Sequence, residues 1–313
     1  MEPTPISGIR YFFPPAGSVV TGLDQRVQIP CGDLPIPLLE DDFGSMEGSC
    51  PSYDAVGRGI YHVLRANPEC AFGAEYARIL QDGYPHFISE MASQILMLDR
   101  KDVDVAYLDR KINYLKIFAL NEPGNARFPL EIGMTFMDKG LRLSALHLAT
   151  VSLYRAEEFL RKAMQLPPED ATIRYHLGEV SYILGKYDDV LSCWNGILSQ
   201  LGEQEARRIE HRLGRIEAGI LPRVPVVDYL EAIASALSFH QQGEFAEAAG
   251  ILLDVLDDAV FHEEFPMPEV SYVLGLCCSG MGMPRYAEDY FRDALDQNPE
   301  YEEAGNALAN LCR

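Results

Sequence analysis

Two stretches of the chain share the same spacing of small and large residues, and this spacing constrains the fold more than any other feature. The first, YHLGEVSYILGKYDDVLSCW, runs from Tyr175 to Trp194, and the second, YVLGLCCSGMGMPRYAEDYF, runs from Tyr272 to Phe291. In each stretch a Leu-Gly pair is followed by another glycine and then by a large aromatic residue, and each of these positions recurs after 97 residues. The residues between them differ, so a requirement for small and large side chains at fixed positions is enough to explain the shared spacing.

The spacing predicts a unit of two helices joined by a tight turn. Gly178 is small enough to let a first helix approach its partner closely. Gly185 lies where the chain must reverse, at a place where a glycine adopts a positive φ at little cost. Trp194 then fills the gap between the two helices. Units of this kind bury their apolar faces by stacking on the next helix pair.

This pattern resembles the tetratricopeptide repeat (TPR), a helix-turn-helix unit of about 34 residues. The resemblance covers Ala171–Gln204 and Pro268–Tyr301 in full, and Tyr229–His262 and Ala126–Pro168 at most of the small and large positions. Residues 53–120 match only in part. The resemblance implies an all-α fold, a right-handed superhelical solenoid of antiparallel helix pairs.

Helical periodicity, interrupted by short Gly, Pro or Asp punctuation, extends from Tyr53 to the end, and no strand pattern occurs in that part. The segment 142–166 is expected to be one helix, about three turns longer than the TPR norm. The last helix is expected to cap the array. Helices are expected near residues 53–67, 71–82, 85–98, 103–120, 126–139, 142–166, 171–184, 187–200, 203–219, 226–242, 245–259, 268–281, 284–297 and 301–312.

The N-terminal residues differ from the rest because they are rich in proline and have no helical period. They are expected to form an extended arm, with a short hairpin around Ser18–Ile29. The arm carries Phe12, Phe13, Leu38 and Leu39, so part of it is expected to pack on the helical body of its own or a neighbouring copy. The predicted division is an extended Pro/Gly-rich arm (1–52), degenerate helical repeats (53–125), TPR-like repeats (126–204), an inserted helix and linker (205–228), TPR-like repeats (229–301) and a capping helix (302–313).

The chain is strongly acidic, with a formal net charge of −21. Residues 226–313 contain 17 Asp and Glu against three Arg and no Lys. Such a surface repels phosphates and anionic lipids, so neither nucleic acid nor membrane insertion is expected, whereas a basic partner fits. The same charge also serves solubility alone. Seven cysteines without framework spacing, and no basic and apolar leader pattern, favour a reducing, cytoplasmic location.

No G-x-S-x-G, P-loop or H-E-x-x-H motif occurs in the sequence. Cys277 and Cys278 fall on a predicted helix and are expected to be packed thiols. The segment VFHEEF, expected to be an acidic loop, offers a metal His262, Glu263 and Glu264 without a fourth ligand. The sequence therefore predicts no catalytic residue, no cofactor and no metal site.

The TPR resemblance implies that the first helices of successive units line a concave surface. Only Arg127 is basic among the positions that face ligand in the family, so the clamp that binds chaperone tails is absent and a cochaperone role is disfavoured. The partner-binding residues implied are Arg127, Glu131, Met134, Thr172, Tyr175, His176, Glu179, Tyr182, Ile233, Leu237, His240, Gln241, Tyr272 and Leu276. Their character fits an apolar and basic peptide. Alternatively, Tyr175 and Tyr272 simply pack against neighbouring repeats.

Three hypotheses for the function follow. The leading one is a protein-protein interaction scaffold or adaptor that binds a peptide or protein segment in a concave groove. The second, from a different class, is a structural protein that forms homo-oligomers through residues 1–52. An enzyme or metal-binding protein is the third, and no motif in the sequence supports it.

Overall fold

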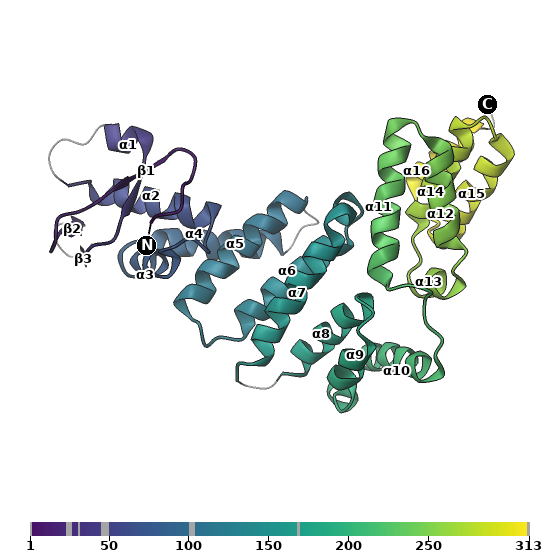
Figure 1. Ribbon diagram of the computed structural model, residues 1–313, viewed down its shortest axis with the longest axis horizontal. Coiled ribbons are helices and arrows are strands. Elements are labelled where there is room, and N and C mark those ends of the chain that lie inside the picture. The colour runs from purple at the N-terminus through teal and green to yellow at the C-terminus, as the bar shows by residue number, and fades with distance from the viewer. Residues whose placement is uncertain are drawn as a thin grey trace. The chain divides into compact units, whose positions relative to one another are not determined.

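The computed structural model describes residues 2–22, 27–30, 32–44, 50–99, 104–167 and 170–311. The chain divides into two compact units, residues 1–136 with 159–169, and residues 137–158 with 170–313. In the described residues the fold is all-α apart from a small non-helical arm at the N-terminus, as predicted (Figure 1). No helix in the described ranges is long and apolar enough to cross a membrane.

The helices begin at the capping and proline residues that the sequence places between the helical segments. Asp170 caps the helix that follows it by accepting a hydrogen bond from the backbone N–H of Thr172 at 2.8 Å, and Pro85, Pro268 and Pro284 each begin a helix. The helices are α1 (Glu40–Gly44), α2 (Tyr53–Ala66), α3 (Gly73–Gly83), α4 (Pro85–Leu98), α5 (Val105–Asn121), α6 (Arg127–Leu141), the 3-10 helix η1 (Leu143–Leu148), α7 (Ala149–Met164), α8 (Ala171–Ile183), α9 (Tyr187–Trp194), the 3-10 helix η2 (Leu198–Gln200), α10 (Glu203–Ala218), α11 (Val226–Gln242), α12 (Phe245–Leu256), α13 (Ala259–Glu264), α14 (Pro268–Gly280), α15 (Pro284–Gln297) and α16 (Glu302–Leu311).

The second unit contains the helix pairs that the repeat pattern predicts. α8 contacts α9, α11 contacts α12, and α14 contacts α15. Stacking joins successive pairs, because α12 also contacts α14 and α15 contacts α16 (Figure 1). Each pair therefore buries on its neighbour the apolar face that it cannot bury alone.

The small and large residues of the repeat meet inside each pair. A methyl group added at Gly178 would overlap the indole ring of Trp194, and one added at Gly275 would overlap the ring of Phe291. Trp194 is fully buried, and its Nε1–H donates a hydrogen bond to the carbonyl oxygen of Tyr175 at 3.1 Å. The turn glycine Gly185 has a φ of 71°, as its predicted role requires.

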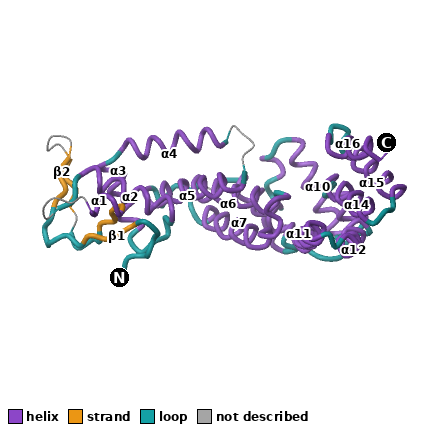
Figure 2. Tube along the Cα trace, turned by 90° about the horizontal axis from the view of Figure 1, so that it is seen from above, coloured by secondary structure: helices purple, strands orange, loops and turns teal. Residues whose placement is uncertain are grey.

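The N-terminal arm forms two small antiparallel sheets. β2 (Val19–Gly22) pairs with β3 (Val27–Pro30), which confirms the predicted hairpin, although its turn lies outside the described residues. β1 (Ile9–Phe12) pairs with β4 (Ile36–Leu39), a pairing that the sequence did not reveal because its strands are far apart along the chain. Figure 2 shows the strands beside α1, α2 and α3.

The arm packs on the helices of its own chain. Ile36 and Leu38 are fully buried in the same apolar cluster as Ile60 of α2 and Leu80 of α3. The hydroxyl of Tyr76 donates a hydrogen bond to the carbonyl oxygen of Pro35 at 2.5 Å. These contacts confirm that part of residues 1–52 packs as extended chain on the helical body.

Phe13 departs from the expectation that the apolar residues of the arm are covered. Its side chain is 66% exposed, whereas Phe12 and Leu39 are partly buried. Phe13 follows the last residue of β1 and precedes two prolines, so it lies beyond the paired strands that hold the arm on α2.

Three predicted segments differ from the structure. The segment 142–166 begins as the 3-10 helix η1, so the expected single long helix is wrong at its start. The helix expected over 187–200 ends at Trp194, because Gly196 has a φ of 91° and interrupts it. Residues 260–264, expected to be part of an acidic loop, belong to the short helix α13, which Asp258 caps.

The contact between Gly178 and Trp194 gives a first prediction. Gly178→Ala should lower the free energy of unfolding by about 1–3 kcal/mol, because the added methyl group forces the indole ring or the helix to shift. Gly214→Ala is the matched control, since Gly214 lies in a helix with nothing within 4 Å of an added Cβ. It should stabilise the protein by about 0.5–1 kcal/mol through helix propensity. Urea unfolding measures both, and equal effects would contradict the close contact.

The arm gives a second prediction, at the place where β4 meets α2. A methyl group added at Gly59 would overlap the backbone of Pro37 and Leu38. Gly59→Ala should therefore loosen the arm, speed hydrogen exchange in residues 9–12 and 36–39, and raise the binding of a hydrophobic dye. Gly124→Ala, with open space around its added Cβ, should change neither. Unchanged exchange in the Gly59→Ala protein would show that the arm does not lie on α2.

Candidate binding surfaces

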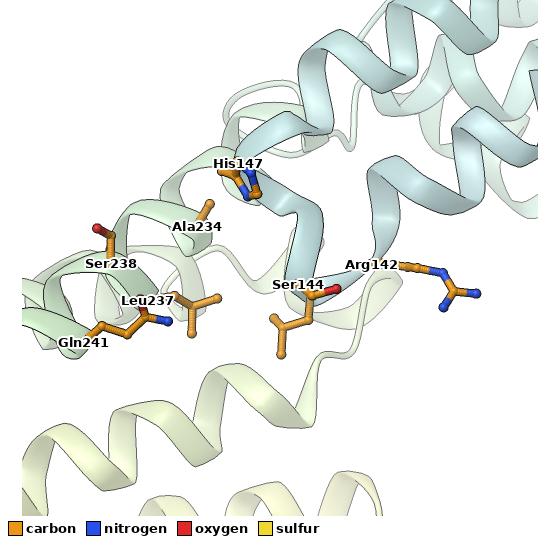
Figure 3. Close-up of a pocket in the computed structure, with 8 residues that line it drawn as sticks. Arg142, Ser144, His147, Ala234, Leu237, Ser238 and Gln241 are labelled. Atoms are coloured by element: carbon orange, nitrogen blue, oxygen red, sulfur yellow. The ribbon is translucent and has the colours of Figure 1, made fainter. Parts of the chain in front are cut away.

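Two predicted groove residues of α11, Leu237 and Gln241, line a hollow of about 730 Å³, which is called the α11 hollow (Figure 3). Figure 3 shows Leu237 and Gln241 on one helix and Ser144 and His147 on the segment that faces it. Arg142 points away from α11, and its Nη2 pairs with Asp138 Oδ2 at 3.1 Å. The residues lining the hollow are Arg142, Leu143, Ser144, His147, Ala234, Leu237, Ser238 and Gln241.

The 3-10 helix η1 forms the second wall of this hollow because it packs directly on α11. Ala145 and Leu146 are buried, which leaves Ser144 and His147 exposed. Two other predicted groove residues of α11 serve different roles. Ile233 belongs to the buried core, and the ring of His240 lies 5.5 Å from that of Phe245.

A second hollow, of about 490 Å³, lies between α14 and α16 and is called the α14 hollow. Tyr272 and Leu276, both predicted groove residues, form part of it. The ring of Tyr272 also contacts Tyr301 at a centroid distance of 5.2 Å, so this residue packs against a neighbouring segment as well. The polar side chains of Glu303 and Asn306 on α16 complete the rim.

The first unit has a hollow of about 450 Å³ between α4, α5 and α6, called the α5 hollow. Predicted groove residues Arg127 and Glu131 line it. Its floor is apolar and its other charged rim residues are acidic. Met134, on the same helix α6, is half-buried. The complete lining is Ala92, Ile95, Leu96, Asp99, Leu115, Phe118, Glu122, Asn125, Arg127, Phe128 and Glu131.

Three predicted groove residues of α8, Tyr175, Glu179 and Tyr182, are covered by the inserted helix α10. Glu179 Oε1 accepts a hydrogen bond from Arg212 Nη1 at 2.8 Å, and Glu179 Oε2 lies 3.4 Å from Arg208 Nη2. The guanidinium of Arg212 lies 4.6 Å from the ring centroid of Tyr182. That of Arg208 lies 5.6 Å from the ring centroid of Tyr175. These side chains of α8 therefore face α10 rather than an open groove.

The arginines of α10 also reach Glu264, the last residue of α13. Arg212 Nε lies 3.5 Å from Glu264 Oε2, and Arg215 Nε lies 3.1 Å from Glu264 Oε1. The hydroxyl of Tyr182 donates a hydrogen bond to Glu264 Oε2 at 2.8 Å. The side chains of Arg212 and Glu264 are only 10% and 5% exposed, so this is a buried ionic layer.

Burial is the largest cause of the pKa shifts of the titratable side chains on α8. It raises the pKa of Glu179, and the positive charge of Arg212 opposes that effect. Burial raises the pKa of Tyr182 too, and the hydrogen bond to Glu264 acts in the same direction. For His176 burial lowers the pKa, while the charge of Glu205 opposes it. Thr172, in the first turn of α8, is exposed.

Sequence reasoning missed this ionic layer, although part of its signal was present. Arg208, Arg212 and Arg215 are spaced so that they lie on one face of a helix. Their acidic partner Glu264 follows them by about fifty residues in a segment expected to be a loop, and no sequence pattern links the two.

Asp258 links the start of α13 to Arg223 and Tyr229, a second set of contacts that the sequence did not reveal. Its carboxylate accepts hydrogen bonds from the backbone N–H of Val260 at 3.0 Å and of Phe261 at 3.2 Å, which caps α13. It also accepts from the backbone N–H of Arg223 at 2.7 Å and from the hydroxyl of Tyr229. Burial alone would raise the pKa of Asp258, but these hydrogen bonds outweigh it and hold the pKa below its usual range.

The described ranges were compared with the needs of a metal site and of a reactive thiol. They contain no group of three or more His, Cys, Asp or Glu side chains that could hold a metal ion. Cys277 and Cys278 are packed in α14, as predicted, and burial raises the pKa of both thiols, that of Cys277 to about 11. Such thiols are poor nucleophiles at neutral pH.

Comparison with known proteins finds similarity at the level of structure. No protein-family model and no curated protein matches the chain. The TPR domain of P58(IPK) is 17% identical over 83% of this chain and 64%, less than two thirds, of that domain, with a TM-score of 0.33. A thermophilic TPR protein from Thermus thermophilus is 14% identical over 83% of this chain and 90% of its own, with a TM-score of 0.22. YrrB, a TPR protein with an unusual peptide-binding site, is 17% identical over 80% of this chain and 98% of its own, also with a TM-score of 0.22.

The junction at Asp258 gives a third prediction. Asp258→Asn should lower the free energy of unfolding at neutral pH by about 1–3 kcal/mol, because the amide leaves buried donors without an acceptor. Since the pKa is lowered in the folded state, the contribution of the carboxylate is present above the unfolded-state pKa of about 3.9 and is lost as pH falls through the folded-state value. The difference between parent and variant should therefore shrink on acidification.

Urea unfolding of both proteins at a series of pH values measures this effect. Asp257→Asn is the matched control, because the Asp257 side chain is 77% exposed and lies next to Asp258. A cost of Asp258→Asn that does not vary with pH would contradict the assignment.

Proposed function

We propose that the protein is an interaction scaffold that holds a segment of another protein in the α11 hollow. The observation that carries this proposal is the composition of the hollow. Leu143, Ala234 and Leu237 supply apolar surface, and the side chains of Ser144, Ser238 and Gln241 supply hydrogen-bonding groups around it. An apolar surface with a few polar groups suits a protein segment, because the apolar part gives affinity and the polar groups fix its orientation.

The chemistry of the surroundings favours a basic partner. Residues 226–313, which contain all the helices from α11 to α16, carry 17 acidic residues against three arginines. A field of this sign attracts positively charged segments and speeds their association. The α14 hollow, with Glu303 on its rim, offers a second contact of the same character. An apolar and basic segment, extended or helical, therefore fits best.

The proposal assigns no catalytic residue and no cofactor, and the cytoplasmic location stays a prediction. Self-assembly through residues 1–52 is the alternative function. Its supporting observation is the exposure of Phe13 and Val19 on the arm, at 66% and 45%. Light scattering of the parent and of a Phe13→Asp variant distinguishes the two functions, because a monomeric mass for both proteins would remove self-assembly.

The α11 hollow gives a fourth prediction. Leu237→Asp should reduce binding of the partner at least tenfold, because it places a charge in the apolar part of the contact surface. Leu253→Asp is the matched control, since Leu253 is an exposed leucine on α12, the other helix of the same pair. A photo-crosslinking residue at position 237 in the native host identifies the partner.

Binding is then measured with the purified partner and the parent, Leu237→Asp and Leu253→Asp proteins. Melting temperatures of all three show whether each variant is folded. A partner that binds the Leu237→Asp and Leu253→Asp proteins equally well would exclude the α11 hollow as the binding surface.

A further inference from the structure

The inserted helix α10 occupies the face of α8 that the TPR resemblance assigns to a ligand. Its arginines bind the carboxylate of Glu179 and stack on the rings of Tyr175 and Tyr182. The same helix also engages Glu264 through Arg212 and Arg215. α10 thus makes the contacts that a ligand of this face would make.

Few apolar contacts hold α10 in place. Of its 16 residues, only Ile209, Arg212, Leu213 and Arg215 are buried, and two of these four are charged. By contrast, all the buried residues of α11 are uncharged, and the helix buries six of them. α10 is also flanked by Gly202 and by the C-cap Gly219, whose φ is 68°, so residues that tolerate more than one backbone conformation adjoin both of its ends.

The ionic character of the contact makes release of α10 less costly than release of an apolar helix. A buried ion pair contributes little net free energy, because each charge has lost its hydration. When α10 moves away, Arg212, Arg215, Glu179 and Glu264 all regain water. Segments held by few apolar contacts are the ones that open locally while the rest of a protein stays folded.

We propose that α10 is a releasable internal ligand, and that the face of α8 beneath it binds a helix of a partner protein whose arginines have the spacing of Arg208, Arg212 and Arg215. This inference deepens the proposed scaffold function and rests on it. The partner helix replaces α10, so the protein regulates access to this face by itself.

The contacts of α10 define the chemistry of the partner. One guanidinium must reach both Glu179 and Glu264, as Arg212 does at 2.8 and 3.5 Å. It must also lie over aromatic rings, as Arg212 lies 4.6 Å from the Tyr182 centroid and 5.3 Å from that of Phe265. Arginine meets both requirements, because its planar fork matches carboxylates and stacks on rings, whereas lysine provides a point charge.

Competition explains how such a device works. An internal ligand on a short tether has a high effective concentration, so a partner of equal intrinsic affinity binds only weakly while α10 is in place. Weakening the hold of α10 removes this competition and leaves Glu179, Glu264 and the aromatic rings unchanged. A protein with substitutions that loosen α10 should therefore bind a separate peptide of the α10 sequence more tightly than the parent protein does.

The test uses full-length protein and a fluorescent synthetic peptide with the sequence of residues 203–218. Binding is measured by anisotropy for the parent and for the double variant Arg212→Gln with Arg215→Gln. We expect the double variant to bind the peptide at least tenfold more tightly than the parent does. A peptide with glutamine at both positions should not bind. Arg207→Gln is the control, because Arg207 pairs with Glu203 on α10 itself and is 73% exposed, so it should bind as the parent does.

Hydrogen exchange in the parent protein gives a second, independent measurement. Amides of α10 should exchange at least tenfold faster than those of α8 and α11. Equal protection of α10 and α8 would overturn the proposal, and so would equal affinity of the peptide for the parent and the double variant. If circular dichroism shows that the double variant is unfolded, hydrogen exchange in the parent decides the matter.

The outcome is separable from that of the proposed function, which is tested at Leu237. If Leu237→Asp has no effect on partner binding but the double variant binds the peptide, the α8 face stands without the α11 hollow. If only the Leu237→Asp result is as expected, the scaffold function stands and α10 is a permanent part of the fold.

Discussion

The close contact between a glycine on one helix and an aromatic ring on the next sets the geometry of the helix pairs. At Gly178 the absence of a side chain lets the indole of Trp194 lie directly against the backbone of α8, and the ring donates a hydrogen bond to Tyr175. Gly275 and Phe291 repeat the contact two pairs later in the array. Beside these contacts, each first helix presents further residues on an outward face, where they meet η1, α16 or α10.

What covers that outward face differs from pair to pair, and this difference gives the surfaces their separate chemistry. On α11 the face lies beside η1 and leaves the α11 hollow. On α8 it is covered by arginines of α10, which bury an ionic layer rather than an apolar one. An apolar cover would be more stable but would be released only at a high cost in free energy. The charged cover favours exchange with a partner that carries the same groups.

Much of the fold could be predicted from the sequence, because helix pairs leave local signals such as Gly185 at a turn and Pro268 at a helix start. The hairpin of β2 and β3 had a similar local signal. The pairing of β1 with β4, the cap at Asp258 and the ionic layer around Glu264 could not be predicted, since each joins segments that are distant along the chain. For the groove, the spacing of the repeat predicted that Leu237 and Glu179 lie on the ligand-facing side of their helices. It could not predict that η1 or α10 would pack on that side.

Contact between Gly178 and the ring of Trp194 fixes the α8–α9 pair, and a double-mutant cycle measures the coupling between the two residues. The free energy of unfolding is measured for the parent, Gly178→Ala, Trp194→Leu and the double variant. Because leucine leaves room for the added methyl group, Gly178→Ala should cost at least about 1 kcal/mol less in the Trp194→Leu background than in the parent. The same cost in both backgrounds would mean that the two residues do not interact and that other contacts set the geometry of the helix pair.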